Sequence, residues 1–214
     1  MDEEVIIIDT KTRNEKIKNF FINNMKNLII GFSFIFILVI VYLSMKEMKE
    51  REKIKLAKQF NITTINFKIE DKQRTIDQLT RMINQNDATY SPLALYFLID
   101  NNLIDNKDEI NNLFDQLIKE TSLDEEIKNL IIYKKALFNS EFSTENDLLR
   151  ILSPIINSES IWKSHSLYLL AEYFYSKNQK QKAKEFFEQI LLLPSANNDI
   201  KIESKKRINR DIGE

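Results

Sequence analysis

The chain has 214 residues, of which 43% are hydrophobic and 29% are charged, a composition that fits a folded domain. Its net charge of -1 offers nucleic acid no general electrostatic attraction. With two glycines and three prolines, the chain lacks the turn residues that an all-β fold needs. It has no cysteine, so disulfides, thiolate catalysis and cysteine metal sites are excluded.

Residues 1–27 form the predicted N-terminal segment, an acidic tip followed by a basic lead-in. Between Thr10 and Asn27, apolar residues recur at helical spacing; they are Ile17, Phe20, Phe21 and Met25. Two interpretations are open for this lead-in. It is either a short amphipathic helix on a membrane surface or the frayed start of the helix that follows.

Residues 28–45 contain no charged side chain, and the run is 18 residues long. A helix of that length covers about 27 Å, close to the thickness of a thin hydrocarbon core. Apolar residues lie all round the helix, as lipid on every side requires, and Lys26 and Lys46 bracket the run. The sequence therefore predicts one transmembrane helix.

Two alternatives to a membrane anchor are weaker. A helix buried in a soluble core needs more surrounding protein than this chain provides. A cleaved signal peptide is disfavoured because 27 residues precede the run and no small-residue cleavage site follows it.

The charges beside the span leave its orientation open. Five cations precede the run and six follow it closely: Lys11, Arg13, Lys16, Lys18 and Lys26, then Lys46, Lys49, Arg51, Lys53, Lys55 and Lys58. The positive-inside rule does not separate five from six.

Residues 46–71 are predicted to be a charged helical linker. The helix is expected to continue to about Phe60, and the β-branched stretch "NITTINFKIED" is where it breaks or bends.

Residues 72–214 show one amphipathic helix after another, separated by loops of a few residues. The predicted caps are Ser91 before Pro92, a capping box of Ser122 with Glu125, and a stop before Pro154. Asn takes the usual place of Gly at several helix ends. Because such helix pairs bury little alone, the predicted fold is all-α: a single transmembrane helix followed by an α-solenoid of stacked helical hairpins.

The pair from Ser164 to Ser195 resembles a tetratricopeptide repeat (TPR), in which small residues allow two helices to approach closely. The matching positions are Leu167, Leu170, Ala171, Phe174, Ala183, Phe187 and Pro194. Residues 90–121 and 122–153 resemble weaker copies. The resemblance implies that the seven matching positions of the Ser164–Ser195 pair pack the two helices of the hairpin against each other.

The whole layout is similar to the YfgM-like tetratricopeptide family, ancillary subunits of the SecYEG translocon. The stretches that carry this resemblance are "SPLALYFLIDNNLID" and "SIWKSHSLYLLAEYFYSKNQKQKAKEFFEQIL". The resemblance departs at "NITTINFKIEDK", where the family usually continues as alanine-rich helix. It implies a bacterial inner-membrane protein with a cytoplasmic N-terminus and a periplasmic repeat domain. It also implies translocon subunits, periplasmic chaperones and exported clients as partners.

No arrangement of catalytic residues is evident. His165 is the one histidine, so no histidine metal pair is possible, and its position predicts a surface side chain. No nucleophile elbow, phosphate-binding glycine loop or metalloprotease motif occurs. We therefore expect no enzyme, no cofactor, no metal site and no small-molecule substrate.

A repeat domain offers instead a groove for a partner. In the TPR-like pair, the first helix would line this groove with His165, Tyr168, Glu172, Tyr175 and Ser176. Tyrosines and a carboxylate suit an extended or helical peptide. The alternative is that Tyr168 and Tyr175 pack against the neighbouring helix pair.

Three functions compete. The first is an interaction module beside the protein-export channel, and the second is a scaffold or assembly factor of another envelope complex. The third is a membrane-tethered adaptor that faces the cytosol. An enzyme would require an active site that no motif reveals.

Overall fold

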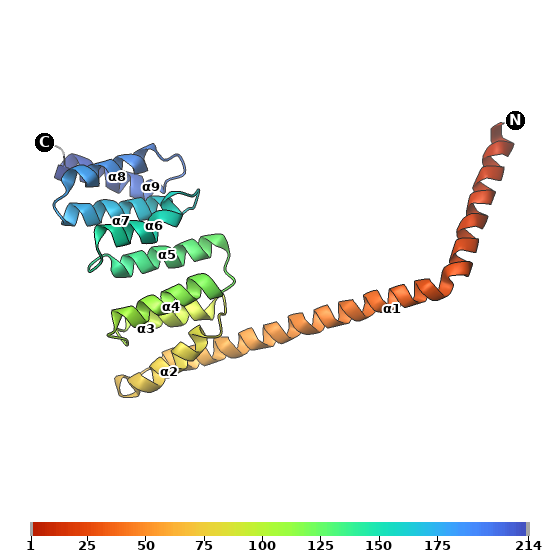
Figure 1. Ribbon diagram of the computed structural model, residues 1–214, viewed down its shortest axis with the longest axis horizontal. Helices are drawn as coiled ribbons and strands as arrows, with labels where there is room; N and C mark the ends of the chain where they lie inside the picture. The colour runs from red at the N-terminus through yellow and green to blue at the C-terminus, as the bar shows by residue number, and fades with distance from the viewer. Residues whose placement is uncertain (1, 213–214) are drawn as a thin grey trace. The chain divides into compact units, whose positions relative to one another are not determined.

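The computed structural model describes the backbone of residues 2–212 and the side chains of residues 15, 18–27 and 29–212. The described backbone is all-helical, as the sequence predicts (Figure 1). Its elements are α1 (Asp2–Ile65), the 3-10 turn η1 (Ile69–Asp71), α2 (Lys72–Ile83), α3 (Tyr90–Asp100), α4 (Lys107–Glu120), α5 (Glu125–Asn139), α6 (Glu145–Ile156), α7 (Lys163–Ser176), α8 (Lys180–Leu192), α9 (Asn198–Arg207) and the π turn η2 (Ile208–Ile212).

The chain divides into two units, residues 1–55 and residues 56–214. Within the first unit, α1 exposes apolar side chains from Phe20 onward, and Phe32 is 70% exposed. The segment from Ile29 is long and apolar enough to cross a membrane, and none of its apolar window is buried. The side chains of Ile17 and Leu28, which the sequence assigns to the lead-in and the span, lie outside the described residues.

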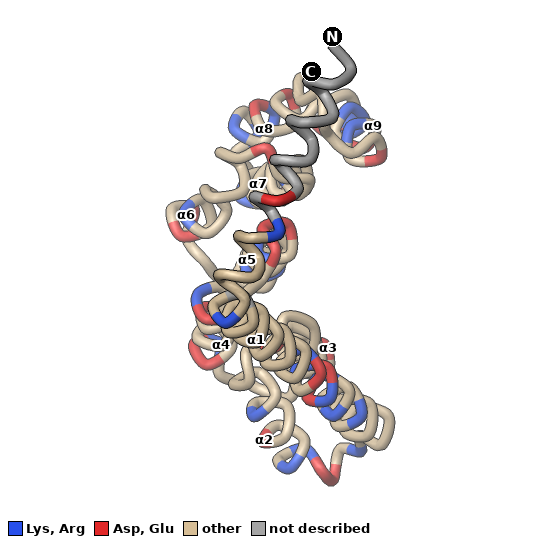
Figure 2. Tube along the Cα trace, turned by 90° about the vertical axis from the view of Figure 1, so that its right-hand side faces the viewer, with Lys and Arg blue, Asp and Glu red and all other residues tan. Residues whose placement is uncertain are grey.

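The second unit, which we call the helical unit (residues 56–214), consists of helices that pack on their neighbours in chain order. Figure 1 shows α2 to α9 following one another in this way. In addition, α5 contacts α7, and α7 contacts α9. Acidic and basic residues are mixed along most of these helices, and three basic residues gather in the last turn of α9: Lys205, Lys206 and Arg207 (Figure 2).

Two hydrophobic cores fill the helical unit. The first core includes Leu79, Leu95 and Phe114, and the second includes Leu170, Phe174 and Phe187. They meet at α5, where Ile131 belongs to the first core and its neighbour Ile132 to the second. Adjacent residues of a helix point about 100° apart, so α5 has one face for each core.

The end of α1 belongs to the helical unit. The helix continues past Phe60 to Ile65, and Leu56 and Phe60 pack in the first core. After the helix ends, Phe67 lies edge-on to Phe97 of α3, with ring centroids 5.7 Å apart. Packing therefore begins at Leu56, whereas the repeat domain expected from the sequence starts at Lys72. The charged residues around Leu56 and Phe60 hide these apolar positions in the sequence.

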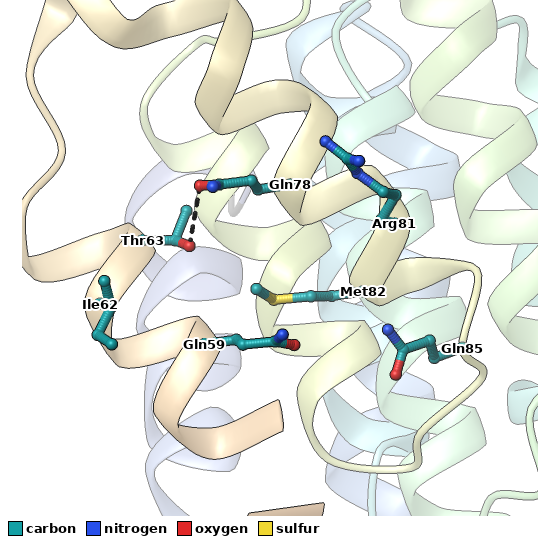
Figure 3. Close-up of a pocket in the computed structure, with 7 residues that line it drawn as sticks. All are labelled: Gln59, Ile62, Thr63, Gln78, Arg81, Met82 and Gln85. Carbon is teal, nitrogen blue, oxygen red and sulfur yellow. Dashed lines mark hydrogen bonds between the residues drawn. The ribbon is translucent and has the colours of Figure 1, made fainter. Parts of the chain in front are cut away.

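A cavity of about 360 Å³ lies between the end of α1 and α2 (Figure 3). Thr63 Oγ1 donates a hydrogen bond of 3.2 Å to Gln78 Oε1 at its edge. The remaining lining residues are Gln59, Ile62, Arg81, Met82 and Gln85.

Three expected helix boundaries are wrong. Helix α3 begins at Tyr90, and Asp87 Oδ1 accepts hydrogen bonds from the N–H groups of Thr89 and Tyr90 at 2.9 and 2.7 Å. Ser91 is not the cap, because its hydroxyl donates to the carbonyl of Met82 at 2.8 Å.

The other two corrections concern α5 and α6. The capping box of Ser122 and Glu125 does not form, since α5 starts at Glu125 after Asp124. Helix α6 runs through Pro154 to Ile156. A proline costs a helix one hydrogen bond, here to the carbonyl of Arg150, and both residues are exposed, so water can replace the missing donor.

The expected asparagine helix ends are confirmed. Asn86, Asn102 and Asn178 follow α2, α3 and α7 with φ of 52°, 49° and 59°. This left-handed conformation is one that asparagine tolerates better than most non-glycine residues.

Candidate functional site

The start of α7 is fixed by contacts with α5. Ser160 Oγ donates to Glu126 Oε2 at 2.8 Å and accepts a hydrogen bond from the backbone N–H of Trp162 at 3.1 Å. Trp162 Nε1 donates to the carbonyl of Glu126 at 3.1 Å. These bonds set the position from which the side chains of α7 project.

The close contact between α7 and α8 depends on small side chains. Ala171 and Ala183 are fully buried, and six of the seven residues in the expected packing set are buried: Leu167, Leu170, Ala171, Phe174, Ala183 and Phe187. Pro194, the seventh, is exposed just beyond the end of α8. The ring of Phe174 also stacks on Phe186, with centroids 5.4 Å apart.

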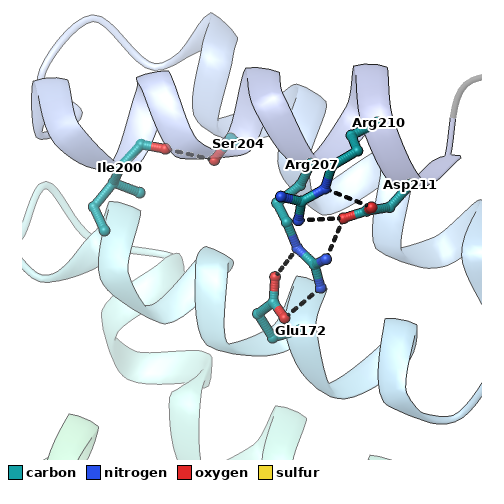
Figure 4. A network of polar contacts seen from close by, with 6 residues as sticks. All are labelled: Glu172, Ile200, Ser204, Arg207, Arg210 and Asp211. Atoms are coloured by element: carbon teal, nitrogen blue, oxygen red, sulfur yellow. Dashed lines mark hydrogen bonds and ion pairs between the residues drawn. The ribbon is translucent and has the colours of Figure 1, made fainter.

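Three of the five expected groove residues lie together, beside α9 and η2. Glu172 Oε1 accepts from Arg207 Nε at 2.6 Å, and Glu172 Oε2 accepts from Arg207 Nη2 at 2.7 Å (Figure 4). The same guanidinium lies over the ring of Tyr175, 4.3 Å from its centroid. Tyr168 packs edge-on against Phe187 of α8, with centroids 5.5 Å apart.

Burial and neighbouring charges shift the pKa values of Tyr168, Arg207 and Asp211. Burial first, and then the carboxylate of Glu172, raise the pKa of Tyr168 to about 12. The hydrogen bonds with Glu172 are the main reason that the pKa of Arg207 is raised. Asp211 accepts hydrogen bonds from Arg210 and Arg207, and these two donors lower its pKa to about 2.

The other two expected groove residues lie apart from this cluster. His165 is half-buried rather than on the surface, because it packs against Trp162 and Tyr133 with ring centroids 5.2 and 6.1 Å away. Its Nδ1 atom is buried without a hydrogen-bond partner. Ser176 is exposed, and its hydroxyl donates to the carbonyl of Tyr173 at 2.8 Å.

Further cavities open on the helical unit. One of about 260 Å³ is lined by His165 together with Ile161, Trp162, Ser195 and Asn197. A larger polar one of about 650 Å³ lies over α4, α5 and α6. There Asn139 Nδ2 donates to Asn111 Oδ1 at 2.7 Å, and Lys135 pairs with Asp115 at 2.9 Å.

The contact between Glu172 and Arg207 is absent from the sequence predictions. The two residues are 35 positions apart, and arginine in an exposed C-terminal helix has no distinctive sequence signal. The spacing of Arg207 and Asp211, four residues apart on one helical face, is a local signal that could have indicated part of this ion-pair network, although no sequence prediction used it.

The described residues were compared with the geometry of metal sites, and the chain with known proteins. Within the described part of the chain, no group of three or more His, Asp or Glu side chains is arranged to hold a metal ion. No protein-family model matches the chain, and no curated protein or solved structure matches it.

Proposed function

We propose that this protein is a membrane-anchored, TPR-like α-solenoid that acts as a protein–protein interaction module. The observation that carries the proposal is the exposed apolar stretch of α1. Phe32 is 70% exposed and Val39 47% exposed, and none of the apolar window is buried. So large an exposed apolar surface is unfavourable in water and favourable in lipid.

The packing of the helical unit supports the TPR-like part of the proposal. Its helices contact their neighbours in chain order, and the contacts of α5 with α7 and of α7 with α9 link alternate helices. Stacked helical hairpins produce such a pattern, because each hairpin buries its apolar faces against the next. The buried Ala171 and Ala183 fit the close helix approach of a TPR hairpin.

The partners we propose are those that the resemblance implies: subunits of the Sec translocon, periplasmic chaperones and exported clients. The N-terminus would lie in the cytoplasm of a bacterial cell and the helical unit in the periplasm. The anchor would then raise the local concentration of the module beside the export channel. The alternatives are a scaffold or assembly factor of another envelope complex and an adaptor that faces the cytosol.

Photo-crosslinking in native membranes tests this proposal. A photoreactive amino acid would replace Ile161, which is 65% exposed and lines the cavity beside His165. The same substitution at Ile202, 55% exposed on α9, provides the matched control position. We expect adducts with translocon subunits or exported chains at Ile161 and fewer at Ile202.

The other outcomes separate the alternatives. Adducts with a different envelope complex would favour the scaffold, and adducts with cytosolic proteins alone would favour the adaptor. If neither position gave a protein adduct, a role as an interaction module would be contradicted.

A further inference from the structure

We propose that residues 198–212, which form α9 and η2, are a displaceable internal ligand of the hairpin of α7 and α8, both of which they contact. The partner that displaces them is an amphipathic helix with an arginine in the place of Arg207. This inference rests on the proposed function as an interaction module, and it specifies the chemistry of the partner. We call residues 198–212 the C-terminal segment.

The surface beneath the segment is suited to a guanidinium group. Glu172 presents both carboxylate oxygens to Arg207, at 2.6 and 2.7 Å, and Tyr175 presents the face of its ring. Two parallel charge-assisted hydrogen bonds require the planar fork of arginine, which lysine does not have. An aromatic face adds cation–π attraction. Together, Glu172 and Tyr175 select arginine.

The segment presents one face to this site. Ile200, Ile208 and Ile212 pack against the second core, with Arg207 beside them and Ser204 buried. Ile200, Ser204, Ile208 and Ile212 recur at intervals of four residues, about one helical turn, and Arg207 is adjacent to Ile208, so all five lie toward one side of the segment. A competing helix would need the same order: apolar, small, arginine with an adjacent apolar residue, and apolar.

The segment is held less firmly than the hairpin on which it lies. Ser204 is the one fully buried residue of α9, and its hydroxyl bonds to the carbonyl of Ile200 in the same helix. Ile202 is 55% exposed. By contrast, α7 buries Leu167, Leu170, Ala171 and Phe174. Local opening is easiest where few apolar groups are buried, so the segment can leave while α7 and α8 stay folded.

The segment also covers residues that the sequence analysis assigns to a partner groove. Glu172 and Tyr175 are occupied by Arg207, so a partner reaches them once the segment has moved away. A helix of matching chemistry would replace the contacts that are lost.

The first experiment is hydrogen exchange on the full chain in detergent micelles, comparing the wild type with Arg207→Glu. Because charge repulsion replaces the two charge-assisted hydrogen bonds to Glu172 and the one to Asp211, we expect amide exchange in residues 198–212 to rise about tenfold or more. Exchange in α7 and α8 should stay unchanged. Lys205→Glu, at an exposed position of the same helix, makes the same charge change and should have little effect.

The second experiment uses a fluorescent peptide with the sequence of residues 196–214. We expect this peptide to bind the Arg207→Glu chain at least about tenfold more tightly than the wild type, whose site is occupied. In the double variant Glu172→Arg with Arg207→Glu, the reversed ion pair holds the segment in place. Binding of the wild-type peptide should then fall back to the wild-type level or below.

Three results would overturn the proposal. The first is unchanged exchange in the segment of the Arg207→Glu variant. The second is an equal rise of exchange in α7 and α8, which would make the segment an inseparable part of the core. The third is peptide binding that does not differ between the wild type and Arg207→Glu. Neither measurement uses a membrane partner, so failure here leaves the crosslinking result intact, and a failed crosslinking test leaves this result intact.

Discussion

Two tyrosines of the helical unit differ in what their hydroxyl groups contact. Tyr173 Oη donates to the carbonyl of Ser143 at 3.0 Å, which joins α7 to the turn before α6. Tyr96 Oη is buried and has no hydrogen-bond partner, and burial raises the pKa of Tyr96 to about 12. A paired hydroxyl stabilises a fold modestly, whereas an unpaired buried one costs desolvation energy.

Replacing each tyrosine by phenylalanine should therefore have opposite effects on the free energy of unfolding. We expect Tyr173→Phe to lower it by about 1 kcal/mol, and Tyr96→Phe to leave it unchanged or raise it by up to about 1 kcal/mol. Denaturant unfolding followed by circular dichroism measures both, and each variant is the control for the other. Equal losses would show that the hydroxyl of Tyr96 has a partner in solution.

At the scale of the elements, the division into two cores predicts which helices a core mutation destabilises. Leu79 belongs to the first core and Phe187 to the second, and both are fully buried. Leu79→Ala and Phe187→Ala should each cost about 2 to 5 kcal/mol, because each leaves a cavity. Since the helices mainly contact their chain neighbours, we expect each substitution to destabilise the helices around its own core more than those around the other core.

Hydrogen exchange under native conditions tests this locality. Phe187→Ala should accelerate exchange in α7, α8 and α9 more than in α2 and α3, and Leu79→Ala should show the reverse order. Each variant is again the control for the other. If both variants accelerated exchange uniformly from α2 to α9, the two cores would form one cooperative unit.

The helices themselves were largely predictable, because their signals are local. Apolar spacing predicts the α2 face of Leu79, Met82 and Ile83, and asparagine predicts the left-handed ends at Asn102 and Asn178. The caps were less predictable, since a side chain that is able to cap a helix can find another partner. The hydroxyl of Ser91 donates to the carbonyl of Met82, nine residues earlier in the chain. Asp87, and not Ser91, accepts the hydrogen bond from the N–H group of Tyr90 at the start of α3.

At the scale of the whole molecule, the site was less predictable than the fold. Sequence spacing placed Tyr168, Glu172 and Tyr175 on one face of a helix, but it did not show what covers that face. The covering residue, Arg207, lies 35 positions from Glu172. Similarly, the sequence predicted a surface position for His165 because it does not show that Tyr133, from another helix, packs against the His165 ring.

Membrane sidedness is the property of the whole chain that most directly divides the proposed functions. Because the chain has no cysteine, a single introduced thiol reports one position. Ser195 and Glu15 are both exposed, and they lie on opposite sides of the apolar stretch in the sequence. The two variants Ser195→Cys and Glu15→Cys would be treated in intact bacterial cells with a maleimide that enters the periplasm but does not cross the inner membrane.

A single span requires that one of the two cysteines is labelled without lysis and the other only after it. We expect Ser195→Cys to be labelled in intact cells, because the proposed function requires the helical unit to be in the periplasm, whereas the flanking charges favour neither side. Labelling of Glu15→Cys instead would place the helical unit in the cytosol, where export partners are out of reach and the adaptor becomes the leading function. If both cysteines were labelled without lysis, or both only after it, both ends would lie on the same side, and the apolar stretch of α1 would not cross the membrane.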